Sequence, residues 1–222
     1  MTPRLDRPAG KPLKAIPRTA RSVRTKSEPR RTQQQRRDAT RQKLLEAAVR
    51  CIAELGYHGA TMDSIVARAG LSRGAQMHHF PTKQDFAVAT YEYLLGNLAE
   101  QLRTQTRKIL DEGDEASTLF EYLWKKYYSG DLFAVSMELA LTSRFERSMR
   151  PPLLELTDRF HRSVDECWLL LCREKKIDEE STLRLLNMTM SLLRGMAVQT
   201  VLWNRAEPLH QQLEQWLKLT RL

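Results

Sequence analysis

The fold is decided by LLEAAVRCIAELGYHGATMDSIVARAGLSRGAQMHHFPTKQDF, which spans residues 44–86 of the 222-residue chain. Its first part places apolar side chains three and four residues apart, from Leu44 through Ile52 to Leu55. Such spacing predicts an amphipathic helix, which we expect over about 38–55. Gly56 ends this helix, because glycine readily adopts the left-handed conformation found just after helices.

The second part of this stretch predicts two short helices joined by a tight turn. Thr61 is a suitable N-cap for the first of them, and Gly70 ends it. Ser72 can then cap a helix over about 73–80, which Pro81 stops. Two helices joined by a short glycine-containing turn form the unit that places its second helix in the DNA major groove. The stretch therefore predicts a helix-turn-helix.

The remainder of the chain reads as helix after helix. Thr82 can cap a long helix, with Asp85 at the position of a capping box. No alternating strand pattern interrupts the helical spacing, so the sequence predicts an all-α fold. The expected helices, separated by Gly, Pro and charged turns, run over about 83–110, 115–129, 132–146, 151–175, 179–203 and 208–220.

Positive charge is concentrated at the N-terminal end of the chain. Residues 1–43 hold 14 of the 36 Lys and Arg but only three of the 27 Asp and Glu, so the remainder is nearly neutral. Residues 1–36 also contain five prolines and no hydrophobic periodicity, which predicts a disordered tail. A basic segment directly before a helix-turn-helix is typical of a chain that contacts nucleic acid. A solubilising leader and, more weakly, an organelle presequence are the alternatives.

Other features of the sequence exclude several classes of protein. No apolar run is long enough to cross a membrane. Cys51, Cys167 and Cys172 are too scattered for a disulfide framework and predict small buried side chains in a reducing compartment. There is no nucleophile, phosphate-loop or metalloprotease motif, so we expect no enzyme, no catalytic residues and no cofactor. We expect a cytoplasmic, nucleoid-associated protein of a bacterium.

The stretch from Thr40 to about Leu95 resembles the DNA-binding domain of the TetR family of transcriptional regulators. The resemblance rests on elements in a fixed order: Gly56–Tyr57, Thr61, Gly70, His79–Phe80 and Lys83. It covers about a quarter of the chain. It implies a helix-turn-helix domain at 37–84 after the tail at 1–36, followed by a helical effector-binding and dimerisation domain at 85–222.

The resemblance also implies which residues meet DNA. Thr61 and Met62 approach the phosphate backbone, and Lys83 meets a phosphate. The family usually has Leu-Tyr within the recognition helix, whereas Gln76 and Met77 stand here, which puts the tyrosine contact in doubt. For Arg73 the alternative is a solvated surface charge. The adjacent His78 and His79 have no third ligand in register, so we expect no metal site. The residues expected at base edges or along the groove wall are Ser72, Arg73, Gly74, Gln76, Met77, His78 and His79.

For the C-terminal body the resemblance is architectural only. It implies pairing of two copies through the last two helices, with the expected interface at Leu186, Met190, Leu193, Ala197, Val201, Leu213 and Trp216. Aromatic and methionine side chains at helical spacing are candidates for a ligand pocket, although such a stripe can equally be plain core: Trp124, Tyr128, Phe133, Met137, Phe160, Trp168 and Met188. Possible polar anchors for a ligand are Arg144, His161 and Arg194.

These observations predict a homodimeric, sequence-specific DNA-binding regulator. The leading hypothesis is a repressor that a small-molecule effector releases from a near-palindromic, double-stranded operator. An effector-independent regulator or an activator is the alternative, and a protein that coats DNA without sequence choice is a further one. The sequence identifies neither the effector nor the operator.

Overall fold

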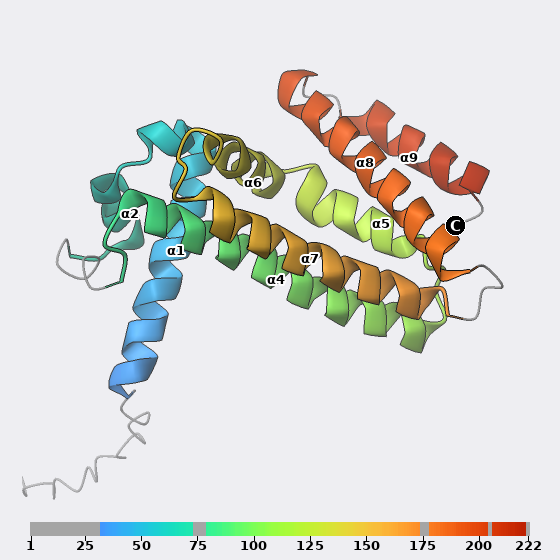
Figure 1. The fold of residues 1–222 in the computed structure, drawn as a ribbon, viewed down its shortest axis with the longest axis horizontal. Coiled ribbons are helices and arrows are strands. Elements are labelled where there is room, and N and C mark those ends of the chain that lie inside the picture. Colours follow the sequence, from blue (N-terminus) through green and yellow to red (C-terminus); the bar gives the residue numbers. More distant parts are fainter. Residues whose placement is uncertain (1–31, 73–78, 174–177, 204–205, 221–222) are drawn as a thin grey trace, which may run out of the picture.

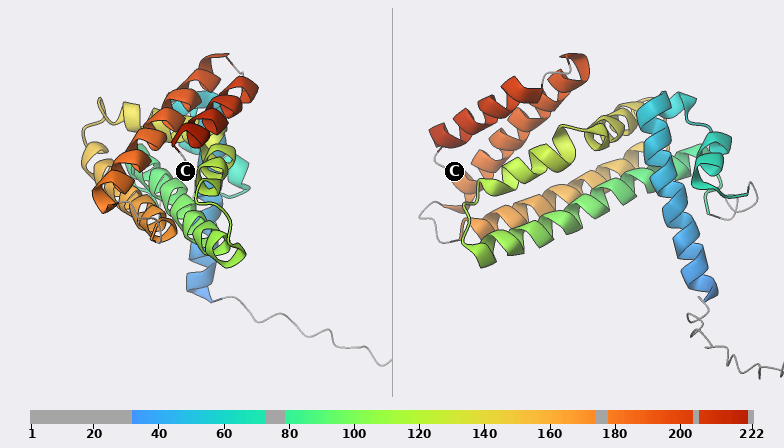
Figure 2. Two further views of the ribbon diagram at one scale, coloured as in Figure 1. Left: turned by 90° about the vertical axis from the view of Figure 1, so that its right-hand side faces the viewer. Right: turned by 180° about the vertical axis from the view of Figure 1, so that it is seen from behind.

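The computed structural model describes residues 32–72, 79–173, 178–203 and 206–220, apart from the side chains of 201–210. Every regular element in these ranges is a helix, which confirms the all-α fold. The long helices α4 (Lys83–Glu112) and α7 (Arg150–Leu171) lie side by side, and α1 (Gln33–Gly59) crosses one end of this pair (Figures 1 and 2). None of the described helices has the length and apolar character needed to span a membrane.

The N-terminal part, which we call the head, consists of α1, α2 (Met62–Ala69) and the chain up to Thr82. Its small core is formed by buried apolar side chains of both helices and by Phe80, whose ring meets that of Phe86 at 4.6 Å. A salt bridge between Glu54 and Arg68 also links α1 to α2. The buried apolar contacts, with this salt bridge at their edge, fix how α1 and α2 cross.

Local capping follows the sequence prediction at α2 and α4, whereas α1 continues past its expected end at Leu55 to Gly59. Thr61 caps α2, Thr82 caps α4 with Asp85 at the third position, and Gly70 ends α2 at φ +65°. The backbone of α1 breaks at Gly56, where φ is +70°. A left-handed conformation is strained for residues with a Cβ atom, so these two glycines fix the turns that they occupy.

The start of α1 differs from the prediction. The helix begins at Gln33, five residues before the expected start at Asp38, so the end of the segment predicted to be disordered (1–36) is helical. Thr32 accepts a hydrogen bond from the Gln35 backbone N–H, and the Gln35 side chain accepts one from the Thr32 backbone N–H. This capping box is readable in the sequence and was missed, because residues 33–37 carry no apolar side chain.

The remaining helices and α4 together form the part that we call the body. Their order along the chain is the predicted one. The remaining helices are α5 (Thr118–Leu123), the π-helical turn η1 (Trp124–Tyr128), α6 (Asp131–Thr142), α7, α8 (Glu179–Trp203) and α9 (Ala206–Thr220). Helices α8 and α9 pack side by side on the half of the body away from the head (Figure 1). Helix α6 ends four residues before its expected end, and the chain from Ser143 to Met149 connects it to α7.

Candidate nucleic-acid interface and ligand cavity

The entrance to the helix-turn-helix is built by reciprocal hydrogen bonds at the start of α2. The Thr61 hydroxyl accepts from the Ser64 backbone N–H at 3.1 Å, and the Ser64 hydroxyl oxygen accepts from the Thr61 N–H at 3.0 Å. Thr61 and Ser72 are exposed, whereas Met62 is half-buried against the core of the head. The Thr61 hydroxyl is thus occupied as a cap while its side chain still faces solvent.

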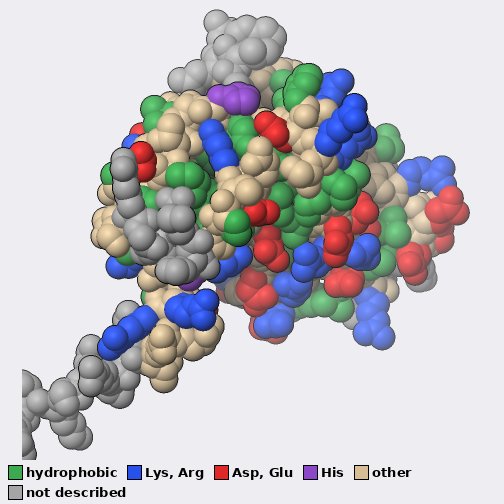
Figure 3. Space-filling view, turned by 60° about the vertical axis from the view of Figure 1, so that its left-hand side comes forward, with side chains coloured by type: hydrophobic (Ala, Val, Ile, Leu, Met, Phe, Trp, Pro, Cys, Tyr) green, Lys and Arg blue, Asp and Glu red, His purple; other side chains and the backbone are tan. Residues whose placement is uncertain are grey.

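Most of the expected recognition helix lies outside the described residues. The predictions for Arg73, Gly74, Gln76, Met77 and His78 fall in this part of the chain and stay predictions. His79 is half-buried beside Phe80, with 6.1 Å between the ring centres. On the face shown in Figure 3, Lys and Arg side chains mark the projecting start of α1, while acidic and basic side chains are mixed over the body.

Lys83, expected at a DNA phosphate, is engaged within the protein. Its Nζ donates to the His58 carbonyl oxygen at 3.2 Å and lies 4.6 Å from the centre of the Tyr57 ring. Partial burial lowers the pKa of Lys83, and the carboxylate of Glu146 acts against this shift. The side chain therefore ties the start of α4 to the end of α1, and a phosphate contact would require it to turn outward.

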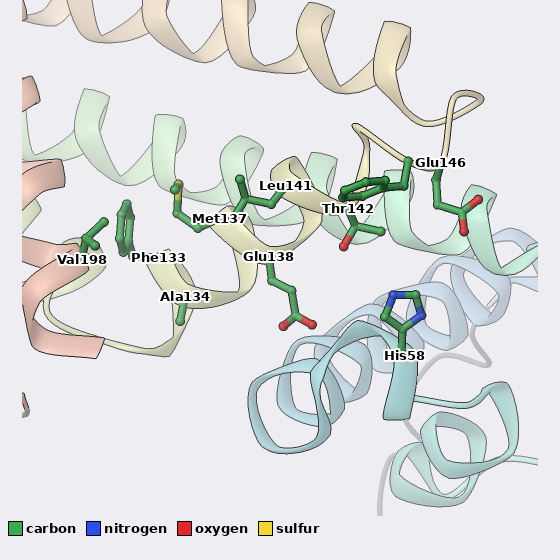
Figure 4. A pocket seen from close by; sticks show the side chains of 10 residues that line it. His58, Phe133, Ala134, Met137, Glu138, Leu141, Thr142, Glu146 and Val198 are labelled. Atoms are coloured by element: carbon green, nitrogen blue, oxygen red, sulfur yellow. The ribbon is translucent and has the colours of Figure 1, made fainter. Parts of the chain in front are cut away.

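Helix α6 holds the head to the body. The Glu138 carboxylate accepts a hydrogen bond from the Tyr57 backbone N–H at 2.5 Å, directly after the break in α1 at Gly56. In Figure 4, Glu138 points from α6 toward the segment that carries His58. Within the body, the Gln84 side-chain amide donates to Glu146 at 3.1 Å, which links the start of α4 to the chain after α6. Movement of α6 would therefore reach the head directly.

An open apolar groove runs along α6 next to this joint. It measures ≈ 580 Å³, and Phe133 and Met137 form part of its wall. Phe145 lies at the groove with 85% of its surface exposed. In Figure 4 the groove extends from Val198 on α8 to Glu138, Glu146 and His58.

A second, partly open cavity lies between the helices of the body. It measures ≈ 300 Å³ and is bounded by α4, η1, α6, α7 and α8. Phe133 and Met137 also line this cavity, so these two side chains form the partition between it and the groove. Four of the seven residues predicted for a ligand pocket line the cavity, together with two of the three predicted anchors: Tyr128, Phe133, Met137 and Phe160, with His161 and Arg194.

The other pocket predictions are placed elsewhere. Trp124 and Trp168 are buried core residues that do not line the cavity, and the Trp168 indole N–H donates to the Thr182 carbonyl oxygen at 3.2 Å. Met188 lies on the outer face of α8 with 53% of its surface exposed, so it is not a cavity residue. Arg144 is exposed after the end of α6. Helical spacing alone cannot distinguish a wall of tightly packed rings from a wall that leaves space.

The sequence reasoning missed several polar groups in the cavity wall, chiefly Tyr91, Tyr127 and Thr157. The neighbours Tyr127 and Tyr128 both face the cavity from the π-helical turn η1. Such turns are rare and often occur at functional sites. The paired aromatic residues in WKKYY were the available signal.

Five of the seven residues predicted for the dimer interface face the interior of the single chain. Leu186, Met190, Leu193, Ala197 and Leu213 are 0–3% exposed in the single chain, so they belong to its own core. The Trp216 indole N–H donates to the Thr189 hydroxyl at 2.9 Å, within one protomer, and the side chain of Val201 lies outside the described residues. Helix α8 has apolar residues on two faces. The face with the more regular helical spacing packs against the core of its own chain.

Comparison with known proteins decides the family. The model of bacterial regulatory proteins of the tetR family matches residues 44–90. The HTH-type transcriptional regulator CymR of Pseudomonas putida is 30% identical over 176 residues, which cover 79% of this chain and 86% of that protein. The chain belongs to the TetR family. It is thus a helix-turn-helix transcriptional regulator, as the sequence predicted.

Solved structures support the same fold over about four fifths of the chain. FadR of Bacillus subtilis, solved with stearoyl-CoA, has a TM-score of 0.56 and 19% identity, covering 80% of this chain and 96% of that one. NemR of E. coli in its reduced form has a TM-score of 0.60 and 19% identity, with coverage of 79% and 95%. At this level of identity the likeness concerns the fold alone.

Proposed function

We propose that this TetR-family regulator is a dimeric repressor that a small molecule, bound in the cavity of the body, releases from a near-palindromic operator. The observation that carries the proposal is the cavity itself, because its walls continue into the elements that hold the head. FadR, which shares this fold, was solved in complex with stearoyl-CoA, and this supports a ligand-responsive role. A ligand shifts DNA binding only if it binds two conformations unequally.

Two helices provide the route from cavity to head. Helix α4 carries Tyr91 and Leu95 in the cavity wall and begins at Lys83 on the head. Helix α6 carries Met137 in the wall, and the next residue, Glu138, bonds to the head. A ligand that displaces either helix changes the position of the reading head, and therefore the spacing of two heads in a dimer.

The DNA contacts of this proposal are those implied by the family. Arg73 reads a base, because its guanidinium can bridge guanine O6 and N7, while Lys83 meets a phosphate after leaving its internal contacts. Ser72, Gln76 and Met77 approach neighbouring bases. The basic segment before Thr32 follows the phosphates and adds affinity that falls as salt rises.

The dimer of this proposal uses the outer face of α8. Met188, Ser191, Gly195 and Val198 recur at three- and four-residue intervals there and are exposed in the single chain. Gly195 has open space above it, which permits close approach of a second helix. An isologous interface of this kind relates the two heads by a twofold axis and requires a near-palindromic site.

The test begins with selection of an operator from random duplexes, followed by fluorescence anisotropy on the selected and a scrambled duplex at several salt concentrations. We expect the selected site to bind about 10³-fold tighter or better. Arg73→Ala should lose about 1–3 kcal/mol on the selected site only, and Lys83→Ala should weaken both duplexes alike. Equal wild-type affinity for both duplexes would instead indicate a DNA-coating protein.

A further inference from the structure

The size and walls of the body cavity restrict what it can hold. Its volume of ≈ 300 Å³ is at the lower end of the range of about 300–1,000 Å³ for small-molecule sites. The rings of Tyr127 and Phe133 meet edge to face at 5.8 Å, and Phe160 lies 6.5 Å from Tyr127. Such a wall offers both ring faces and ring edges, the surfaces against which a further planar ring packs well.

The charge in the cavity is positive and unbalanced. None of the lining residues is Asp or Glu, and Arg194 on α8 is the one lining residue that is always charged. Within the described ranges, no carboxylate lies within ion-pairing distance of Arg194. A half-buried guanidinium without an acidic partner favours an anionic ligand and disfavours a cationic one.

The two partners of Arg194 in the cavity wall, His161 and the Tyr128 hydroxyl, leave most of its donors free. The guanidinium lies 3.0 Å from His161 Nε2, which accepts this hydrogen bond when the imidazole is neutral. Burial, followed by the Arg194 charge, lowers the pKa of His161 and so favours the neutral form. A guanidinium has five N–H donors, so the contacts with His161 and with the Tyr128 hydroxyl use two of them.

The hydroxyl groups of Tyr91 and Tyr127, which line the cavity, donate their hydrogen bonds to other residues of the protein. The Thr157 hydroxyl donates to the Leu153 carbonyl oxygen, so the 2.9 Å contact between Tyr91 and Thr157 is donated by Tyr91. The Ser136 hydroxyl donates to the Phe133 carbonyl oxygen, so the tyrosine is again the donor in the 2.6 Å contact between Tyr127 and Ser136. A ligand therefore meets Arg194 as the main donor, with Tyr128 beside it.

We propose that the cavity binds a small aromatic carboxylate, with the carboxylate on Arg194 and the ring between Tyr127, Phe133 and Phe160. The planar guanidinium can donate two parallel hydrogen bonds to a carboxylate, a bidentate pair. The aromatic side chains of the wall pack against the ring. Identification of this ligand class as the effector rests on the proposed function. Binding of the ligand itself is independent of DNA and is tested separately.

The test is isothermal titration calorimetry on the full chain without DNA, with three probes of similar size. Benzoate is the anion, benzamide its neutral counterpart and benzylamine the cation. We expect benzoate to bind at least about tenfold more tightly than benzamide, since hydrogen bonds to charged groups contribute about 1.5–3 kcal/mol. Arg194→Gln should remove this preference, and Arg194→Lys should keep part of it. Arg162→Gln, an exposed arginine on α7, is the matched control and should change nothing.

Three results would overturn the assignment. They are equal or tighter binding of benzamide or benzylamine, no benzoate binding at a Kd of about 1 mM or below, and a preference for benzoate that persists in Arg194→Gln. Thermal melts of each variant show whether it is folded. The affinity of the ligand-free protein for its operator is measured in parallel, so a failure of carboxylate binding is distinguished from a failure of the proposed function.

Discussion

The head and the body use buried side chains differently. In the head, apolar residues of α1 and α2 close on one another, and residues no more than three positions apart cap the helix starts. In the body, aromatic residues of several helices surround a cavity of ≈ 300 Å³. The head is built to keep one shape, whereas the body can accept an additional occupant. The contacts of Glu138 and Lys83 lie where these two kinds of packing meet.

The largest expected effect tests the two faces of α8. Leu193 is fully buried, so Leu193→Glu places an unpaired charge in the core and should prevent folding, at a cost above about 4 kcal/mol. Gly195→Arg on the outer face should leave the protomer folded, because Gly195 has open space around it within one chain. It should abolish dimerisation, because a large charged side chain would keep the second α8 away. Circular dichroism and analytical ultracentrifugation measure the two outcomes.

Gly96→Arg is the matched control for this pair, since Gly96 is an exposed helical glycine on α4 with similarly open surroundings. It should remain a folded dimer. A folded monomer from Leu193→Glu would return Leu193 to the dimer interface and contradict the inward placement of this face.

The contrast between head and body also shows how far the sequence leads. The head could be predicted closely because caps and glycine turns are local: Thr61, Gly70 and Thr82 act on residues within a few positions. The faces of the body helices could not, because which apolar stripe of α8 turns inward depends on helices distant in sequence. The cavity depends in addition on the π-helical turn at Tyr127 and Tyr128, which regular spacing does not signal.

An intermediate effect is expected at the joint between head and body. Glu138→Ala leaves the backbone N–H of the buried Tyr57 without its acceptor and should lower the free energy of unfolding by about 1–3 kcal/mol. Glu138→Gln retains an acceptor oxygen and should cost less. Urea denaturation measures both. Equal, near-wild-type stability of the two variants would show that the joint does not depend on this hydrogen bond.

The smallest expected effect is on the pH dependence of folding stability. Burial and the Arg194 charge lower the pKa of His161, while Asp165 and Asp158 act in the opposite direction. The unfolded chain therefore binds a proton more readily than the folded one, and stability falls as pH drops below the ordinary histidine value of 6.5. His161→Gln should lose less stability than wild type between about pH 7 and about pH 5, values on either side of the ordinary histidine pKa. An identical pH dependence would contradict the neutral assignment of His161.

The central claim, that occupation of the cavity is transmitted to the head, is tested most directly by filling the cavity without a ligand. Ala140 lines the cavity from α6, whereas Ala134 on the same helix lines the open groove. We expect Ala140→Phe to remain folded and to bind the selected operator at least tenfold more weakly in fluorescence anisotropy, and Ala134→Phe to bind like wild type. A folded Ala140→Phe protein with wild-type operator affinity would contradict transmission from the cavity to the head.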